Sequence, residues 1–283
     1  MSESPFTGRS IALVVNDCDE RAIAAADVLR TWCHEHGVQI KPHKQSQSDQ
    51  SVGLVVALGG DGTILRAIRE LSNYDTPVLG VKFGRLGFLS GAPADELIDA
   101  VAAALQGRVQ VEQRAMLNVR AWSDTTCLGQ YLALNEALMG RNPQAAIVIS
   151  RLVINDHLVY QQQGDGIIAA TATGSTAYAL SAGGPILSPS FRGIALVPLA
   201  SHSLVNRPIV TAPDDAVRIE LPNPAHAGVT LAIDGKAVID NEDADLLLTH
   251  IDVELSNQSV SLVKTSSRLF FDTLASEFFV NRG

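Results

Sequence analysis

Cysteine and positive charge are both scarce in this chain of 283 residues. The three cysteines, Cys18, Cys33 and Cys127, have neither the number nor the spacing of a disulfide framework or a zinc site, so we expect a reducing compartment. Lysine and arginine number 21 against 30 acidic residues, which leaves a formal charge of -9. This balance argues against general binding of nucleic acid or of an anionic membrane. Any phosphate must therefore bind locally.

Long hydrophobic runs are absent as well. The amino terminus, MSESPFTGRS, has no basic segment ahead of the short apolar run Ile11–Val15, so we expect no signal peptide. No apolar run approaches membrane-spanning length. With 46% hydrophobic and 18% charged residues, the chain has the composition of a folded protein and the length for two domains. We expect it to be cytoplasmic.

Two common nucleotide-binding patterns are also missing. The glycine-rich loop at Gly59–Thr63 does not read G-x-G-x-x-G, so a dinucleotide held as a redox cofactor is not supported. No G-x-x-x-x-G-K-[ST] occurs in the chain, and phosphoryl transfer here would not be P-loop chemistry.

The periodicity that is present divides the chain in two. Residues 1–107 alternate β-branched runs with helical patterns, which is typical of a parallel sheet covered by helices. Asp17 and Glu20 have capping-box spacing for a first helix that Gly37 would end. Residues 108–265 show period-two runs and predict a β-rich domain. We expect the apolar segment Arg268–Phe279, within 266–283, to form a helix that packs back on the first domain.

The loop Gly59–Thr63 follows an apolar strand pattern and precedes a helical one. It therefore lies at the carboxyl end of a parallel strand, where α/β sheets bind ligands. Glycines allow a phosphate or ribose to approach the backbone, and the helix offers free N–H groups to an anion. The negative charge of Asp61 would repel phosphate, so it is unexpected in a loop that only binds phosphate. Its presence makes sense if Asp61 accepts a proton or holds a magnesium ion. A tight turn with Asp61 as helix N-cap explains the loop equally well.

A second unusual segment runs from Gly164 to Pro185. Its small hydroxyl residues around Gly174 suit the sugar and phosphates of a nucleotide. Tyr178 could stack on a ring, and Asp165 could accept a hydrogen bond from a carboxamide or hydroxyl. A helix cap rich in threonine and serine explains one or two of these hydroxyls.

Six segments together resemble the signature segments of the NAD kinase family in identity and order. The loop GGDG alone would also admit the related lipid kinases, which LNE and TGSTAY disfavour. The segments are LGGDGTILRA at Leu58–Ala67, VKFGRLGFL at Val81–Leu89, LNE at Leu134–Glu136, GDGIIAATATGSTAYALSAGGPI at Gly164–Ile186, SHSLVNRPIV at Ser201–Val210 and DG at Asp234–Gly235.

This resemblance implies a fold and an activity. The family joins an amino-terminal Rossmann-like α/β domain to a carboxyl-terminal β-sandwich domain that binds NAD, with the active site between them. It phosphorylates the 2′-hydroxyl of the adenosine ribose of NAD, using ATP or another donor and a divalent ion, Mg²⁺ in the usual case. The implied partners are small nucleotides, with no nucleic acid or membrane, and the family forms homodimers or homotetramers.

The resemblance also implies roles for individual residues. Asp61 would accept the proton of the ribose hydroxyl, and no protein residue is assigned as a metal ligand. The residues implied in NAD binding are Asp61, Gly62, Asn135, Glu136, Gln163, Asp165, Thr173, Thr176, Ala177, Tyr178, Ala179, Leu180, Ser181 and Ala200. Those implied in binding phosphate or ATP are Gly59, Gly60, Gly62, Thr63 and Arg66. For Arg66, an exposed helix arginine is an equally good interpretation.

The chain departs from the family pattern at three places. The family commonly has asparagine at Lys82, proline at Ala172 and a basic residue at Gln163. Lys82 either adds a cation near the phosphates or is solvated, and Gln163 bears on the choice between NAD and NADH. Two other functions stay open, namely a lipid or sugar kinase of the same superfamily and a dinucleotide sensor without catalysis.

Overall fold

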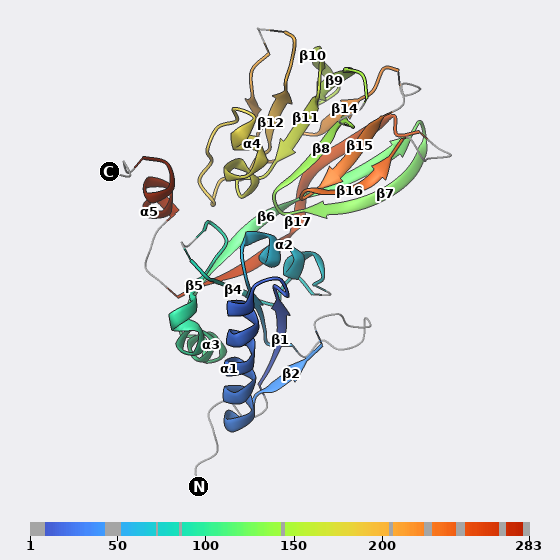
Figure 1. Ribbon diagram of the computed structural model, residues 1–283. Helices are drawn as coiled ribbons and strands as arrows, with labels where there is room; N and C mark the ends of the chain where they lie inside the picture. The colour runs from blue at the N-terminus through green and yellow to red at the C-terminus, as the bar shows by residue number, and fades with distance from the viewer. Residues whose placement is uncertain are drawn as a thin grey trace. The chain divides into compact units, whose positions relative to one another are not determined.

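The computed structural model of the chain describes residues 9–42, 52–71, 73–84, 87–142, 145–203, 206–223, 228–241, 247–265 and 270–279 (Figure 1). By its internal contacts the chain divides into two compact units, Met1–Arg114 together with Ser259–Gly283, and Ala115–Gln258.

The first unit contains a parallel sheet, as its sequence period predicts. The strand order is β2-β1-β3-β4, and β5 and the end of β17 also pair with β4 in parallel. The strands are β1 (Ser10–Val15), β2 (Gln39–Lys41), β3 (Leu54–Leu58), β4 (Val78–Lys82) and β5 (Ala92–Pro93).

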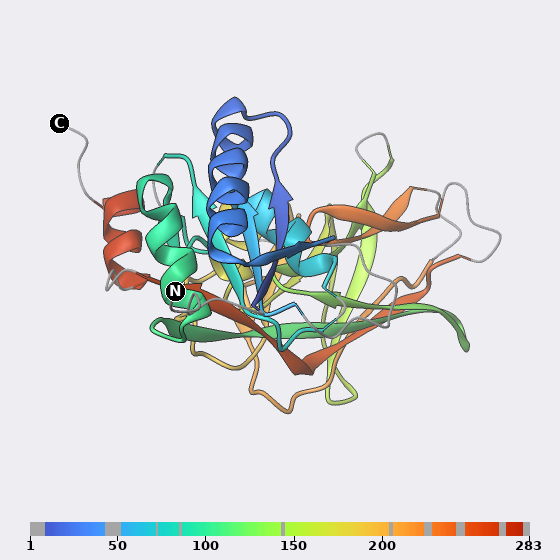
Figure 2. The same ribbon diagram turned by 90° about the horizontal axis from the view of Figure 1, so that it is seen from below.

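Helices cover both faces of this sheet (Figures 1 and 2). Alternate β4 residues Leu79 and Val81 join a buried cluster with α1 and α3, whereas Gly80 between them lies against Ile64 of α2. Because neighbouring strand residues face opposite ways, α2 packs on the face away from α1 and α3. The helices are α1 (Glu20–His36), α2 (Asp61–Arg69) and α3 (Leu97–Leu105), with the 3-10 turn η1 (Ala94–Glu96) before α3.

The start of α1 corrects the capping prediction. The N-cap is Asp19, whose carboxylate accepts a 3.0 Å hydrogen bond from the Arg21 N–H, and Glu20 is the first helical residue. Asp17 thus lies two residues too early, because the capping-box spacing to Glu20 is satisfied in sequence while the chain turns into the helix only after Asp19. Gly37 ends the helix in the left-handed conformation, as predicted.

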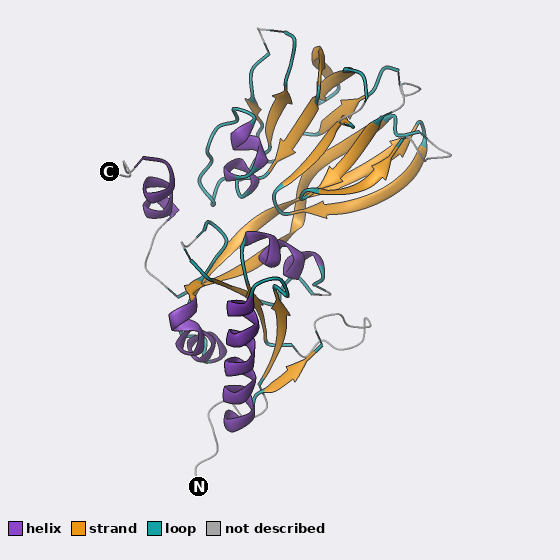
Figure 3. Ribbon diagram, in the orientation of Figure 1, coloured by secondary structure: helices purple, strands orange, loops and turns teal. Residues whose placement is uncertain are grey.

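The second unit is a sandwich of two antiparallel sheets, which confirms the predicted fold class (Figure 3). One sheet has the order β13-β12-β11-β8-β15-β16, and the other runs β10-β9-β14-β17-β6-β7. Residues from both sheets, such as Met139, Ile167, Leu152 and Ile219, form one buried core. The first sheet contains β8 (Glu136–Arg141), β11 (Gly166–Ala170), β12 (Ala195–Leu199), β13 (Ile209–Val210), β15 (Val229–Ile233) and β16 (Lys236–Asp240). The second contains β6 (Gln110–Ser123), β7 (Thr126–Ala133), β9 (Val148–Ile154), β10 (His157–Gly164), β14 (Val217–Glu220) and β17 (His250–Lys264).

The units divide at different residues from the predicted domains. The change of sequence period lies near residue 107, whereas the division falls after Arg114 and again before Ser259. The reason is that β6 and β17 are long strands, of 14 and 15 residues, and each contributes residues to both units. A change of period marks where a strand begins, and a strand can continue past the point where its packing partners change.

The carboxyl-terminal segment contains α5 (Phe270–Leu274) and a π-helical segment, η3 (Ala275–Phe279). Phe88 of the first unit lies 5.4 Å from the ring of Phe270 and 6.2 Å from that of Phe278, measured between ring centroids. The first two residues of the predicted helix, Arg268 and Leu269, lie outside the described residues. No helix in the described part of the chain is long and apolar enough to cross a membrane.

Candidate functional site

The glycine-rich turn is built at the carboxyl end of β3. The N–H of Gly59 donates to the Val81 carbonyl at 3.0 Å, and that of Thr63 donates to the Gly60 carbonyl at 2.9 Å. Gly59 has a φ of 154°, and a Cβ there would collide with the side chain of Thr63. Thr63 is buried beneath the turn. Its predicted contact with phosphate stays a prediction.

Gly60 and Gly62 are glycines for which the fold supplies no reason. Neither has a positive φ, and a Cβ built on either one meets no atom within 4 Å. The backbone here could accept alanine without strain or collision. A ligand that approaches the backbone closely would account for both glycines.

Asp61 is the first residue of α2, and the N-cap is Gly60, which makes no side-chain capping bond. The alternative in which Asp61 serves as N-cap is therefore wrong, because the helix begins at Asp61 itself. Its Oδ1 atom is shielded from solvent and has no hydrogen-bond partner. The Lys82 ammonium lies 3.7 Å from Oδ1. A carboxylate oxygen that accepts no hydrogen bond is suited to accept a proton from a bound hydroxyl.

A loop around Gly87 lies against Asp61. A Cβ on Gly87 would lie 2.7 Å from both Asp61 oxygens and from the Lys82 nitrogen. The loop is held by Lys264, whose ammonium donates to the carbonyls of Phe88 at 3.2 Å and Ser90 at 2.7 Å. Burial, with Arg114 nearby, lowers the pKa of Lys264 to about 8. Arg85 and Leu86 of the resembling segment lie outside the described residues.

Sequence reasoning did not find Lys264. It is far from Gly87 in sequence, and it reaches the loop around Gly87 because β17 pairs with β4 at Leu262. Only the order of strands in the sheet could have revealed it.

Arg66 is neither exposed nor free. Its guanidinium is half-buried and donates to the Val15 carbonyl at 2.5 Å. The interpretation of Arg66 as an exposed helix arginine is therefore wrong. The contact joins α2 to the carboxyl end of β1, and binding of phosphate by the remaining N–H groups stays a prediction.

In the second unit, the LNE segment and the TATGST segment are in direct contact. The Thr171 hydroxyl donates to the Leu134 carbonyl at 2.5 Å, and the Thr171 N–H donates to the Asn135 carbonyl at 2.9 Å. A Cβ on Gly174 would overlap the backbone of Asn135. Two motifs separated by some thirty residues thus form one structural group, here called the Asn135 group, which also includes Glu136.

Several hydroxyls of this segment are used internally. Thr171 and Ser175 are fully buried, and the Ser175 hydroxyl donates to the Ala172 carbonyl at 2.6 Å. The Thr176 hydroxyl donates to the Thr173 carbonyl at 3.1 Å. Internal bonds therefore account for more hydroxyls than the one or two expected of a cap.

The remaining predicted residues of this segment lie on or beside the two short helices that follow, and they differ in exposure. They are η2 (Gly174–Thr176) and α4 (Tyr178–Ser181). Tyr178 and Ser181 are exposed, Ala177 and Leu180 are half-buried, and Ala179 is fully buried. The Ala179 side chain packs against Ile168 and Val197, so only its backbone could contact a ligand.

Asp234 organises the LNE segment. Its carboxylate accepts backbone hydrogen bonds from Leu134, Asn135 and Glu136 at 3.0, 2.7 and 3.1 Å. Burial, and secondarily the charge of Asp234, raises the pKa of Glu136 to about 7. The sequence showed Asp234 only as part of a resembling DG pair, and its role as acceptor depends on pairing between β15 and β8.

Asp165, Gln163 and Ala200 form a separate group at the other end of β11. Arg141 Nε donates to Asp165 Oδ1 at 2.5 Å, a partner that sequence reasoning missed. Gln163 and Ala200 are exposed. The five residues of β11 lie between Asp165 and Thr171 of the Asn135 group, a separation of about 20 Å at the usual strand rise. Leu204 and Val205 of the resembling SHSLVNRPIV segment lie outside the described residues.

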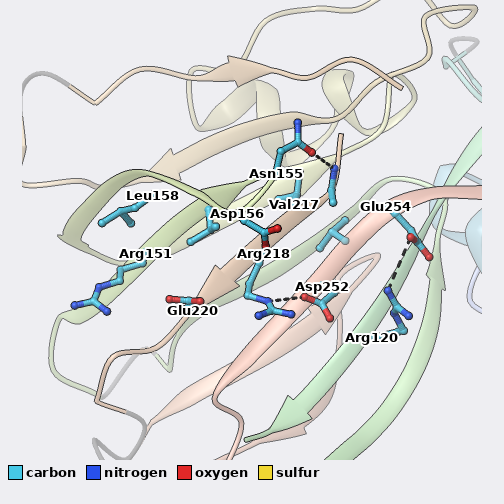
Figure 4. Close-up of a pocket in the computed structure, with 13 residues that line it drawn as sticks. Arg120, Arg151, Asn155, Asp156, Leu158, Val217, Arg218, Glu220, Asp252 and Glu254 are labelled. Carbon is cyan, nitrogen blue, oxygen red and sulfur yellow. Dashed lines mark hydrogen bonds and ion pairs between the residues drawn. The ribbon is translucent and has the colours of Figure 1, made fainter. Parts of the chain in front are cut away.

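A polar hollow of about 600 Å³ on the β6–β17–β14–β9 sheet contains none of the predicted residues (Figure 4). Its ionic side chains are three arginines and four acids, and Arg218 pairs with Asp252 at 2.7 Å. This charge balance does not suit a polyphosphate. We interpret the hollow as a solvated sheet face.

Comparisons with known proteins cover both units. Residues 33–109 match the model of the ATP-NAD kinase N-terminal domain, and residues 134–265 match that of the ATP-NAD kinase C-terminal domain. The chain is 33% identical to NAD kinase of Bordetella avium, over 97% of this chain and 90% of that protein. It is 34% identical to NAD kinase of Paraburkholderia phymatum, over 99% and 91%.

Two solved structures are similar in fold. A yeast NADH kinase crystallised with NADH has a TM-score of 0.82 at 22% identity, covering 97% of this chain and 89% of that one. An NAD kinase from Archaeoglobus fulgidus in complex with ATP has a TM-score of 0.72 at 25% identity, covering 95% and 98%.

Proposed function

The chain belongs to the ATP-NAD kinase family, and we propose that it phosphorylates NAD at the 2′-hydroxyl of the adenosine ribose, with Asp61 as proton acceptor. NAD phosphorylation is the activity named for its relatives. The observation that supports the role of Asp61 most directly is its oxygen Oδ1, which is shielded and without a hydrogen-bond partner at the carboxyl edge of a parallel sheet. The open backbone of Gly60 and Gly62 beside it gives a phosphate chain room to approach.

The chemistry follows from these positions. A ribose hydroxyl is a weak nucleophile, so loss of its proton to Asp61 as the new oxygen–phosphorus bond forms lowers the barrier. The bond between the γ-phosphorus and the bridging oxygen breaks, and ADP leaves with the electron pair. Gly59, Gly60, Gly62, Thr63 and Arg66 are proposed to hold the donor phosphates. Positioning and charge stabilisation supply most of the rate in phosphoryl transfer.

The NAD-binding residues proposed in the second unit have unequal support. The Asn135 group offers polar side chains of Asn135 and Glu136 on a backbone fixed by Asp234. Tyr178 and Ser181 are exposed and free to meet a ligand. Asp165, Gln163 and Ala200 are proposed to bind a more distant part of the dinucleotide, with Arg141 beside Asp165.

We propose that the reaction uses a divalent ion and that the phosphoryl donor brings this ion with it. Asp61 supplies a hard oxygen ligand, but the Lys82 ammonium pairs with that same oxygen. The described residues contain no group of three or more potential His, Cys, Asp or Glu ligands. They therefore do not fit a protein-held ion, and we propose that ATP binds with Mg²⁺ on its own phosphates. The ion neutralises phosphate charge.

We also propose that the chain forms a homodimer or a homotetramer and that it is located in the cytoplasm. Light scattering on the purified protein tests the oligomeric state. A related lipid kinase and a non-catalytic sensor are not favoured, because the relatives that match most of the chain are named NAD kinases.

One assay tests the function. The purified chain is incubated with NAD, ATP and Mg²⁺, and the product is read with an NADP-specific dehydrogenase. We expect NADP to accumulate with time and enzyme, and to require ATP. Phosphorylation of diacylglycerol vesicles in place of NAD would favour the lipid kinase, and NAD binding without product would favour the sensor.

A further inference from the structure

Lys82, the last residue of β4, brings a second charge to the carboxyl edge where Asp61 lies. Its ammonium is 3.7 Å from Asp61 Oδ1, and the two side chains are 28% and 38% exposed. Two other cations near this turn each have a backbone partner: Arg66 donates to Val15 and Lys264 donates to two loop carbonyls. Within the described part of this unit, Lys82 is the cation that forms an ion pair with Asp61, and its ammonium has three N–H groups.

The absence of a side chain at Gly87 leaves the space that the Asp61 carboxylate and the Lys82 ammonium occupy. A Cβ at this position would lie 2.7 Å from Lys82 Nζ and from both Asp61 oxygens. Any larger residue would displace one or both side chains. Lys264 anchors two carbonyls that follow Gly87, those of Phe88 and Ser90, and the Gly87 N–H donates to the Ser90 hydroxyl at 2.9 Å. The fold therefore holds the Asp61–Lys82 pair in a defined place.

The geometry of phosphoryl transfer brings phosphate within reach of Lys82. A base lies about 3 Å from the hydroxyl it deprotonates, and that oxygen lies about 3 to 3.5 Å from the phosphorus. The transferred group must then lie within about 6 Å of Asp61. Lys82 ends 3.7 Å from Asp61 on a flexible four-carbon stem, so its ammonium can reach a phosphoryl group that lies on the same side of Asp61.

We propose that Lys82 is a catalytic phosphoryl-binding residue, whose ammonium contacts the group that passes from the donor to the ribose. This inference rests on the proposed function for its reaction. As the hydroxyl proton moves to Asp61, the carboxylate loses its charge while the donor oxygens remain anionic. Lys82 then stabilises the phosphoryl oxygens and the departing ADP without itself gaining or losing a proton. It would supply the cation that a P-loop lysine supplies elsewhere.

A purely structural role predicts something different. If Lys82 only neutralises Asp61, it becomes dispensable once Asp61 is neutral. If Lys82 contacts phosphate, its loss matters whether or not residue 61 is charged. A double-mutant comparison in the Asp61→Asn background separates these two roles.

The experiment measures binding of inorganic tripolyphosphate by calorimetry, with and without Mg²⁺, to the full chain and to K82M, D61N and D61N/K82M. Loss of one charge-assisted contact predicts a roughly ten- to hundredfold weaker affinity on Lys82→Met in both backgrounds. K82R should retain most of the affinity. Arg69→Met removes an exposed charge from the same helix as Asp61 and should leave binding unchanged.

Equal affinity of K82M and the parent, or a loss confined to the background with Asp61, would overturn the proposal. Kinetics give a second reading, in which K82M raises KM for ATP and lowers kcat while KM for NAD stays constant. Failure of the parent to make NADP would reject the proposed function alone, because tripolyphosphate binding still tests the contact. Circular dichroism confirms that each variant is folded.

Discussion

At the scale of single residues, the candidate site is marked by groups that the fold does not explain. Gly60 and Gly62 have room for a side chain, and Asp61 carries an oxygen without a hydrogen-bond partner. Natural proteins seldom keep such features without a functional reason, since each costs stability. By contrast Gly59 and Thr171 are explained by packing and internal hydrogen bonds.

Gly62→Ala separates structure from function. Gly62 is the second residue of α2 with open space where a Cβ would lie, so alanine should stabilise the protein by about 0.5–1 kcal/mol. The same methyl group should weaken ATP binding, because it intrudes where the phosphates approach. Thermal unfolding and KM for ATP measure the two effects. Gly37→Ala is the control, since its φ of 71° predicts destabilisation with KM unchanged.

Glu136 predicts an unusual dependence of stability on pH. Its pKa is about 7 in the folded protein against an ordinary value of 4.5, so folding favours the protonated form. Its contribution is therefore fully favourable below pH 4.5 and is lost as the pH rises through 7. The loss amounts to about 3 kcal/mol at most, as an order of magnitude.

Glu136→Gln should thus raise the unfolding temperature at pH 8 relative to the parent, with a gain that shrinks as the pH falls toward 4.5. Thermal unfolding across this range measures it. Glu254→Gln is the matched control, since it makes the same change on the exposed sheet face of Figure 4. A destabilisation by Glu136→Gln that is the same at every pH would contradict the raised pKa.

At the scale of elements, the site depends on the hydrogen bonds that hold the segment Leu134–Glu136 in place. Asp234 lies in the turn between β15 and β16, and its carboxylate accepts hydrogen bonds from three successive N–H groups at the start of β8. A single half-buried carboxylate thereby fixes the backbone that carries Asn135 and Glu136.

Asp234→Asn should lower stability by about 1–3 kcal/mol, because an amide cannot accept all three bonds and places its own N–H groups against backbone donors. The amides of residues 134–136 should exchange faster with solvent, and KM for NAD should rise more than KM for ATP. Hydrogen exchange and steady-state kinetics check these outcomes. Asp252→Asn breaks a surface pair with Arg218 and should cost less than about 1 kcal/mol with no kinetic change.

The sequence predicted the elements well where one local pattern determined them. The apolar run Ile11–Val15 matches β1, the strand pattern before Gly59 matches β3, and Gly37 ends α1 as predicted. The cap at Asp19 was missed because Asp17 satisfies the same spacing rule. Thr171 and Ser175 belong to the hydroxyl-rich segment that suits a nucleotide by composition, but both are buried, since composition does not reveal which way a side chain points.

At the scale of the whole molecule, the fold class followed from the change of period, while the limits of the units did not. The strands β6 and β17 each serve both units, and no sequence pattern marks where their packing changes. The same limit applies to the site. Lys264 and Asp234 are brought into place by strand pairing over long sequence distances, whereas Asp61 and Asn135 could be predicted because short motifs contain them.

The most direct test of the account compares the parent and Asp61→Asn in NADP formation at saturating NAD and ATP, with NAD affinity measured separately by calorimetry. Loss of a general base predicts a kcat lowered about 10²- to 10⁴-fold, with NAD affinity within a few-fold of the parent. An Asp61→Asn enzyme that forms NADP at nearly the parent rate would contradict the assignment of the proton acceptor.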